Sequence, residues 1–143
     1  FFNVYGWNQD NRMVVPRFFE QCEEGEDITV FGSGEQTRDF TYIEDTIEAC
    51  YKLIGIKGSH IVNIANESEW CITELASEIK SITKATSKIT YLDAPKKRYD
   101  DEVERRVGSS EKLYKLTKYK PDTELREGLQ KIYEINYPKA VKN

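Results

Sequence analysis

The sequence is poor in the residues that build disulfide frameworks and metal centres. Its 143 residues include only three cysteines and one histidine. Cys22, Cys50 and Cys71 are odd in number, lie far apart and form no Cys-x-x-Cys pair, so neither a disulfide framework nor a zinc site is indicated. His60 has no metal-ligand partner near it in the sequence and is expected on the surface rather than as a catalytic base. We therefore expect reduced thiols and a cytoplasmic protein.

The sequence also lacks a long apolar run and a strong excess of either charge. Residues 1–5 carry no basic stretch and no long hydrophobic segment, so they form neither a signal peptide nor a membrane span. The net charge of −4 provides no electrostatic footprint for a nucleic-acid polymer or an anionic membrane. Because the chain opens without an initiator methionine, in what reads as a strand, we expect it to be a fragment of a longer protein.

The residues that are present are sufficient for one folded domain. A chain of this length with 38% hydrophobic residues can bury a core, and we predict a single compact unit over residues 1–143. Apolar spacing predicts helices at Val14–Cys22 and Cys71–Lys84, a helix that starts at Asp45 through a capping box, a helix capped by Ser109, and a last helix that opens at Thr123. Short buried strands are predicted near 2–6 and at 28–31, 61–65 and 89–92.

The stretch from Ile28 to Asp45 combines a strand, a turn, charged residues and a helix start. Gly32-Ser33-Gly34 ends the strand with residues that tolerate positive φ. Arg38 follows the turn and offers a planar fork of donors suited to a phosphate, and Asp39 beside it would orient or neutralise that fork. This stretch is the strongest candidate for a binding site. A purely structural alternative is that Arg38 pairs with Asp39 or Asp45 to hold the loop.

The order and spacing of several motifs resemble one enzyme family. The motifs are spread over nearly the whole chain: Phe2-Asn3-Val4-Tyr5-Gly6, Val14 to Phe18, the stretch from Ile28 to Asp45, Asn63-Ile64-Ala65, and Ser109 to Leu129. They are similar to the C-terminal, substrate-binding part of the extended short-chain dehydrogenase/reductases that act on nucleotide sugars, such as UDP-glucose 4-epimerase-like enzymes. The resemblance implies an α/β fold, the smaller substrate-binding portion of a Rossmann-type enzyme.

The resemblance also assigns roles to individual residues. Asn3 and Arg38 match positions that bind the substrate's diphosphate, and Val30 and Phe31 match a strand that lies along the base. Arg98 matches an arginine that reaches the phosphates from the opposite side, although it lies in a charged segment whose plain interpretation is a solvated loop. From the residues alone, Asn3 would satisfy a turn. We expect Arg17 to be solvated, because an exposed arginine on a helix usually is, and phosphate binding is the less favoured alternative.

The resemblance places the redox chemistry outside this chain. The family uses NAD, a Gly-x-x-Gly-x-x-Gly turn that seats its pyrophosphate, and a catalytic Tyr-x-x-x-Lys pair. The glycine motif is absent, and Gly32-Ser33-Gly34 precedes Arg38-Asp39 rather than opening a helix. We therefore expect no catalytic, cofactor-binding or metal residue here, and an inactive fragment whose parent binds NAD mainly through a missing N-terminal domain.

Two questions of function stay open from the sequence. The first is the reaction: we favour epimerisation at C4 of a UDP-sugar by a homodimeric parent, with dTDP- or GDP-sugar dehydratases, decarboxylases and reductases as alternatives within the family. The second is whether the chain is instead an independent module that binds another anion or a protein. In that case the fold would be a self-sufficient α+β domain.

Overall fold

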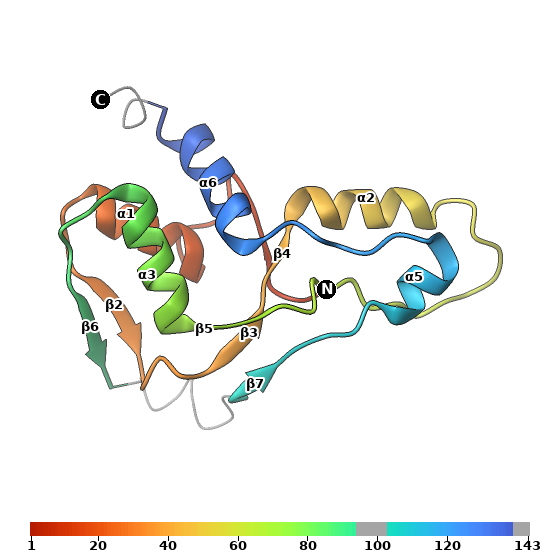
Figure 1. Cartoon of the computed structure of the whole chain (residues 1–143), viewed down its shortest axis with the longest axis horizontal. Coiled ribbons are helices and arrows are strands. Elements are labelled where there is room, and N and C mark those ends of the chain that lie inside the picture. The colour runs from red at the N-terminus through yellow and green to blue at the C-terminus, as the bar shows by residue number, and fades with distance from the viewer. Residues whose placement is uncertain (94–102, 139–143) are drawn as a thin grey trace.

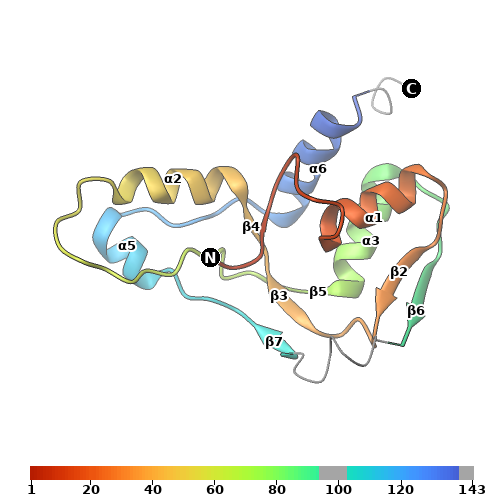
Figure 2. The same ribbon diagram turned by 180° about the vertical axis from the view of Figure 1, so that it is seen from behind.

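The structure is a computed structural model that describes residues 1–93 and 103–138. Helices gather at two ends of an elongated molecule, and short strands cross between them (Figures 1 and 2). The elements in chain order are β1 (Val4–Tyr5), α1 (Val14–Glu23), β2 (Ile28–Phe31), β3 (Thr37–Asp39), β4 (Thr41–Tyr42), α2 (Ile43–Leu53), β5 (Glu69–Cys71), α3 (Ile72–Thr83), β6 (Ile89–Leu92), β7 (Arg105–Arg106), α5 (Glu111–Thr117) and α6 (Leu125–Asn136).

The strands of the described residues form three small sheets. β1 pairs in parallel with β4, and β2 pairs in parallel with β6. The third sheet has the order β5-β3-β7, with β3 antiparallel to β5 and parallel to β7. Parallel neighbours that are far apart in sequence need crossover connections, which α1, α2 and α3 supply. The α/β fold class is thereby confirmed.

The buried apolar side chains form two separate clusters. The larger cluster contains Phe18 and Phe19 of α1, Leu75 and Ile79 of α3, and Leu129 of α6, together with the buried side of β2. Stacked aromatic rings join α1 to α6 within it. The smaller cluster joins α2 to α5 at the other end of the molecule (Figure 1). Its fully buried members are Ala49, Ile64 and Leu113.

The predicted helices are confirmed, but the starts of three of them differ from the prediction, α6 beginning at Leu125 rather than at Thr123. α1 carries Pro16 in its first turn, where a missing amide proton costs little, and α3 has Cys71 at its N-cap as expected. The helix predicted to start at Asp45 begins two residues earlier, at Ile43, with Tyr42 at its N-cap. Asp45 cannot serve as the cap because its carboxylate accepts hydrogen bonds from Thr123.

Two further local predictions need correction. No strand forms at 61–65: the backbone N–H of Ala65 donates to the Ser110 hydroxyl, and the carbonyl of Ile64 accepts from Phe2. α5 begins at Glu111 and has Ser110, rather than Ser109, at its N-cap. Ser110 is buried and exchanges two hydrogen bonds with Ala65, at 2.9 and 2.6 Å, so tertiary contacts replace the strand pairing expected there.

Candidate functional site

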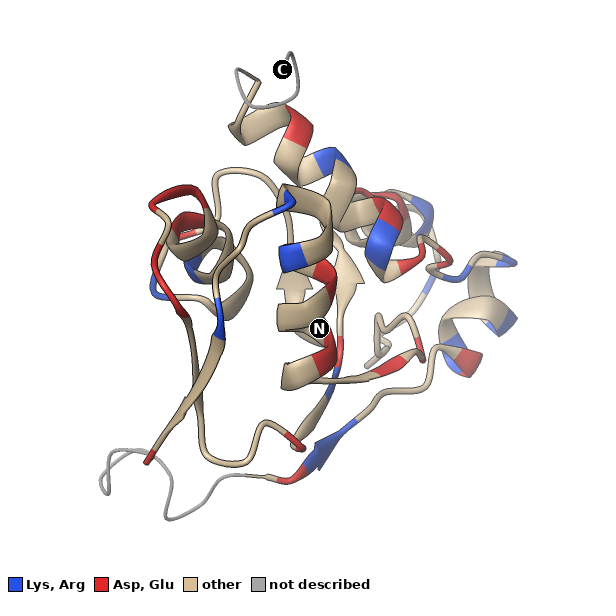
Figure 3. Ribbon diagram, turned by 60° about the vertical axis from the view of Figure 1, so that its left-hand side comes forward, with Lys and Arg blue, Asp and Glu red and all other residues tan. Residues whose placement is uncertain are grey.

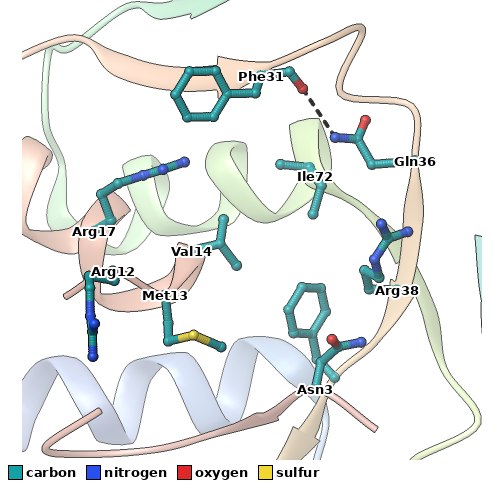
Figure 4. A pocket seen from close by; sticks show the side chains of 10 residues that line it. Asn3, Arg12, Met13, Val14, Arg17, Phe31, Gln36, Arg38 and Ile72 are labelled. Atoms are coloured by element: carbon teal, nitrogen blue, oxygen red, sulfur yellow. Dashed lines mark hydrogen bonds between the residues drawn. The ribbon is translucent and has the colours of Figure 1, made fainter. Parts of the chain in front are cut away.

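A pocket of about 200 Å³ lies where α1, β2, β3 and the start of α3 meet. It brings together three of the sequence-predicted residues, which come from segments far apart in the chain (Figure 4). Five polar side chains and five apolar ones line it: Asn3, Arg12, Arg17, Gln36, Arg38, Met13, Val14, Phe31, Phe40 and Ile72.

Arg38 occupies the β3 wall of this pocket. Its Nη1 donates to the backbone carbonyl of Thr37 at 2.7 Å and to that of Glu104 at 3.4 Å, so backbone atoms set the direction of the guanidinium. Successive side chains of a strand point to opposite faces, and Asp39 therefore projects away from Arg38. The carboxylates of Asp39 and Asp45 bind other groups, as described below.

Asn3 lies near Arg38, at the β3 side of the pocket (Figure 4). Its side-chain amide donates to the backbone carbonyl of Asp39 at 2.9 Å, while its own carbonyl accepts from Thr41 N at 3.4 Å. The backbone of Asn3 has φ of 27°, a region that asparagine tolerates better than most residues. Asn3 thus connects the segment before β1 to the end of β3. It has this structural role in addition to lining the pocket.

The two base-contacting predictions fall on opposite sides of β2. Phe31 lines the pocket, and its carbonyl accepts a hydrogen bond from Gln36 at 3.1 Å. Val30 points into the larger hydrophobic cluster and is fully buried. The strand period of two separates the pair, so the side chain of Val30 cannot contact a ligand in this pocket. That the strand carrying Val30 and Phe31 lies along a base stays a prediction.

Two arginines that precede or belong to α1 complete the cationic lining. The guanidinium of Arg17 lies 5.1 Å from the centre of the Phe31 ring and donates to Thr29 O. Arg12 lies at the mouth, where Asp10 holds it through two contacts of 2.8 Å. The pKa of Asp10 is lowered below its ordinary value by these hydrogen bonds. The sequence favoured a solvated Arg17, but the side chain is half-buried and lines the pocket.

Asp39 is the buried charged residue nearest to this wall. Burial raises the pKa of its carboxyl above the ordinary value, while the backbone amides of Gly108, Asn66 and Glu67 oppose that shift. The side chain has no exposed surface. Asp39 therefore belongs to the scaffold behind the pocket, with no part in its surface.

Sequence reasoning did not identify Arg12, Gln36 or Phe40 as lining residues. The position of Arg12 in the sequence was a usable signal. Arg12 lies in the loop between β1 and α1, and this loop connects the segment that carries Asn3 to the helix that carries Arg17. Gln36 and Phe40 flank Arg38 within two residues, and their place depends on how β3 pairs. Arg98 lies outside the described residues. Figure 3 shows the basic strand β7 beside β3, which carries Arg38.

Gly32 and Gly34 do not form the glycine turn that seats a pyrophosphate in the family. They have φ of 73° and 75° in a turn that leads from β2 to β3 and does not open a helix. A side chain at Gly34 would collide with the Thr73 hydroxyl, so the lack of a Cβ there serves packing against α3. These glycines are thus explained by the fold, as the sequence indicated.

One Tyr-x-x-x-Lys spacing does occur, at Tyr114 and Lys118. Lys118 is the left-handed C-cap of α5, with φ of 59°, and Tyr114 is exposed. The ammonium group lies over the Tyr114 ring, 5.6 Å from its centre. Neither residue lines the pocket, and we assign no catalysis to this pair.

Within residues 1–93 and 103–138 there is no cluster of side chains that could hold a metal ion. In the same part of the chain, no helix combines the length and apolar character needed to cross a membrane.

Comparison with known proteins gives matches along most of the chain. Residues 1–65 match the model of the NAD dependent epimerase/dehydratase family. The chain is 32% identical to a UDP-N-acetyl-alpha-D-glucosaminuronate decarboxylase of Bacillus cytotoxicus over 94% of its residues, and 35% identical to UDP-glucuronic acid decarboxylase 1 of Danio rerio over 93%. It spans only 44% and 31% of the lengths of those two relatives.

Solved structures show the same likeness. A UDP-glucose 4-epimerase of Thermotoga maritima, solved with UDP-glucose, superposes with a TM-score of 0.85 at 25% identity, over 94% of this chain and 44% of the other. A UDP-glucuronic acid 4-epimerase of Bacillus cereus, in complex with UDP-glucuronic acid and NAD, gives 0.82 at 28% identity, over 95% of this chain and 44% of the other. The fold, the motif order and these matches agree: residues 1–65 match the NAD dependent epimerase/dehydratase family, and the chain as a whole resembles part of such enzymes.

Proposed function

We propose that the pocket binds the diphosphate of a nucleotide sugar, with a UDP-sugar favoured, and that the full-length protein uses it for NAD-dependent epimerisation at C4. The convergence of Asn3, Phe31 and Arg38 on one pocket carries this proposal. The three come from the segment before β1, from β2 and from β3.

The chemistry of the lining suits a diphosphate joined to a base. A guanidinium offers a fixed two-pronged donor with a permanent charge, which lysine cannot copy. Arg38 presents that group from a strand whose backbone orients it. Phe31 adds an aromatic surface close to the cation of Arg17, an arrangement that suits a planar base next to anionic phosphates.

The reaction itself is argued from the relatives. Solved structures that resemble the chain include 4-epimerases with UDP-sugars, which supports epimerisation. The curated relatives named above are decarboxylases of UDP-linked uronic acids, so decarboxylation is the second candidate. Assay of the full-length protein against UDP-, dTDP- and GDP-sugars, neutral and uronic, separates the two, because only decarboxylation releases CO₂.

Arg38→Ala tests the binding proposal directly. A charge-assisted hydrogen bond contributes on the order of 1.5–3 kcal/mol, so the variant of the full-length protein should bind UDP roughly ten- to a hundredfold more weakly. Its melting temperature should change little. Isothermal titration calorimetry and a thermal melt on the same sample provide both numbers.

Arg105→Ala is the matched control. Arg105 lies on the neighbouring strand β7, but its guanidinium binds the Glu69 carboxylate at 2.8 Å and does not line the pocket. Its removal should leave UDP affinity unchanged. If Arg38→Ala lowers the melting temperature while affinity stays that of the wild type, Arg38 only holds its loop and the diphosphate assignment fails.

The 143-residue chain alone should show no turnover of any nucleotide sugar, because the pyrophosphate turn of NAD is absent from its sequence. Incubation with NAD and UDP-glucose or UDP-glucuronic acid, followed by product analysis, checks this. Measurable product would overturn the view that catalysis resides elsewhere in the parent.

A further inference from the structure

We infer that Asp39 is a positioning residue for the diphosphate pocket: its buried carboxylate and its backbone carbonyl together fix the two walls that carry Asn3 and Arg38. This inference rests on the function proposed above. Asp39 does not line the pocket, so any effect on binding passes through the residues that do.

The carboxylate of Asp39 gathers three chain segments. Oδ1 accepts from the backbone amide of Asn66 at 3.0 Å, and Oδ2 accepts from the amides of Glu67 at 3.0 Å and Gly108 at 3.2 Å. The Thr41 hydroxyl adds a longer contact of 3.5 Å. A buried carboxylate that accepts from several amides holds them firmly in place, because the loss of any one hydrogen bond leaves a buried polar group unsatisfied.

The carboxylate's bond to Gly108 and the backbone carbonyl of Asp39 both lead to residues that hold the pocket lining. Gly108 lies two residues after β7, the strand paired with β3, and Glu104 just before β7 provides a carbonyl to the Arg38 guanidinium. On the other wall, the backbone carbonyl of Asp39 accepts from the Asn3 amide at 2.9 Å. We therefore infer that Asp39 sets the distance between Asn3 and Arg38, through its backbone carbonyl on the Asn3 side and its carboxylate on the β7 side.

Asp45 supplies an internal comparison. It is 7% exposed and also binds backbone and side-chain donors, namely Thr123 N at 3.0 Å, Thr123 Oγ1 at 3.0 Å and the Tyr119 hydroxyl at 3.2 Å. These bonds fasten the segment between α5 and α6 to α2, and none of the three residues lines the pocket. Asp45 is therefore a buried aspartate with a structural role but no route to the site.

The test compares Asp39→Asn with Asp45→Asn in the full-length protein. Asparagine has the same shape as aspartate, but an NH₂ donor replaces one of the two acceptor oxygens. At least one backbone amide then faces a donor instead of an acceptor. Asp39→Asn should weaken UDP binding roughly tenfold, measured by calorimetry below the melting transition of the variant. Asp45→Asn should lower the melting temperature while the UDP dissociation constant stays within about twofold of the wild type, because affinity is measured on folded protein.

Amide hydrogen exchange of the wild-type full-length protein gives a second reading that needs no variant. UDP should slow the exchange of the Asn66, Glu67 and Gly108 amides, which Asp39 holds, and should leave that of Thr123 unchanged. Equal UDP affinity in wild type and Asp39→Asn, or unaltered exchange of those three amides, overturns the inference alone. Failure of the wild type to bind UDP at all overturns the proposed function, and with it the inference.

Discussion

Single residues show where local rules of sequence yield to tertiary bonds. Asp45-x-x-Glu48 has the spacing of a capping box, yet Asp45 lies inside α2 and binds Thr123 instead. A cap contributes on the order of 1 kcal/mol, and several hydrogen bonds to a buried carboxylate outweigh it. Arg38 was predictable because its chemistry is local. Asp39 was not, since its partners lie 27 to 69 residues away.

Glu67 allows a prediction about acid stability. Its carboxylate accepts from Lys120 Nζ at 2.9 Å and from the Ser110 amide at 2.6 Å, and these bonds lower its pKa below the ordinary value of 4.5. Folding therefore favours the charged form, and the stabilisation is complete above about pH 4.5 and is lost as the pH falls through the folded-state pKa.

Glu67→Gln should accordingly melt at a lower temperature than the wild type at pH 7, and the gap should shrink as the pH drops below about 4.5. Thermal melts from neutral to acid pH measure it. Glu111→Gln serves as the control, because Glu111 forms an exposed pair with Lys115 within one helix and should change little at any pH. A gap that widens toward acid would contradict the pKa direction assigned to Glu67.

A helix or strand can be predicted from the sequence where its apolar pattern lies within one continuous segment. α1, α3 and β2 were predictable because their apolar period lies within a single stretch. β5 and β7 have three and two residues, and both pair with β3 across more than 25 residues of chain, so no local pattern marks them. The pocket wall built on that pairing was beyond the sequence for the same reason.

The start of α3 permits a test of helix capping. Cys71 Sγ accepts from the Glu74 amide at 3.3 Å, and Glu74 Oε2 accepts from the Cys71 amide at 2.8 Å, so a complete capping box forms around a poor acceptor. Cys71→Ser should stabilise the fold by about 0.5 kcal/mol, because a hydroxyl accepts amide hydrogen bonds better than a thiol does. Urea unfolding provides the free energy.

Cys71→Ala is the companion variant, which removes the acceptor and should destabilise by about 1 kcal/mol. The order Ser above Cys above Ala is the expected result. Serine and alanine variants of equal stability would mean that the Glu74 amide gains nothing from the side chain at residue 71.

The whole molecule is organised around two apolar clusters of unequal size. The pocket is built on the larger one, which contains α1, α3 and β2, whereas α2 and α5 share the smaller. Of the bonds described above, those of Asp39 join β3 to the segments at Asn66 and Gly108, and those of Asp45 join α2 to the segment between α5 and α6. The family resemblance predicted the α/β class, but periodicity alone cannot reveal how a core divides.

That division has a consequence for cooperativity. Hydrogen bonds to a buried carboxylate act over a short range and are lost together once water reaches the carboxylate. We therefore expect them to couple the unfolding of the two clusters less strongly than a continuous apolar core would. The 143-residue chain should unfold in two steps, with amides of α5 around Leu113 exchanging faster than those of α3 around Leu75 and Ile79. Calorimetry should then give a van't Hoff enthalpy smaller than the calorimetric one. A single transition with equal enthalpies would show that the two clusters unfold as one cooperative unit.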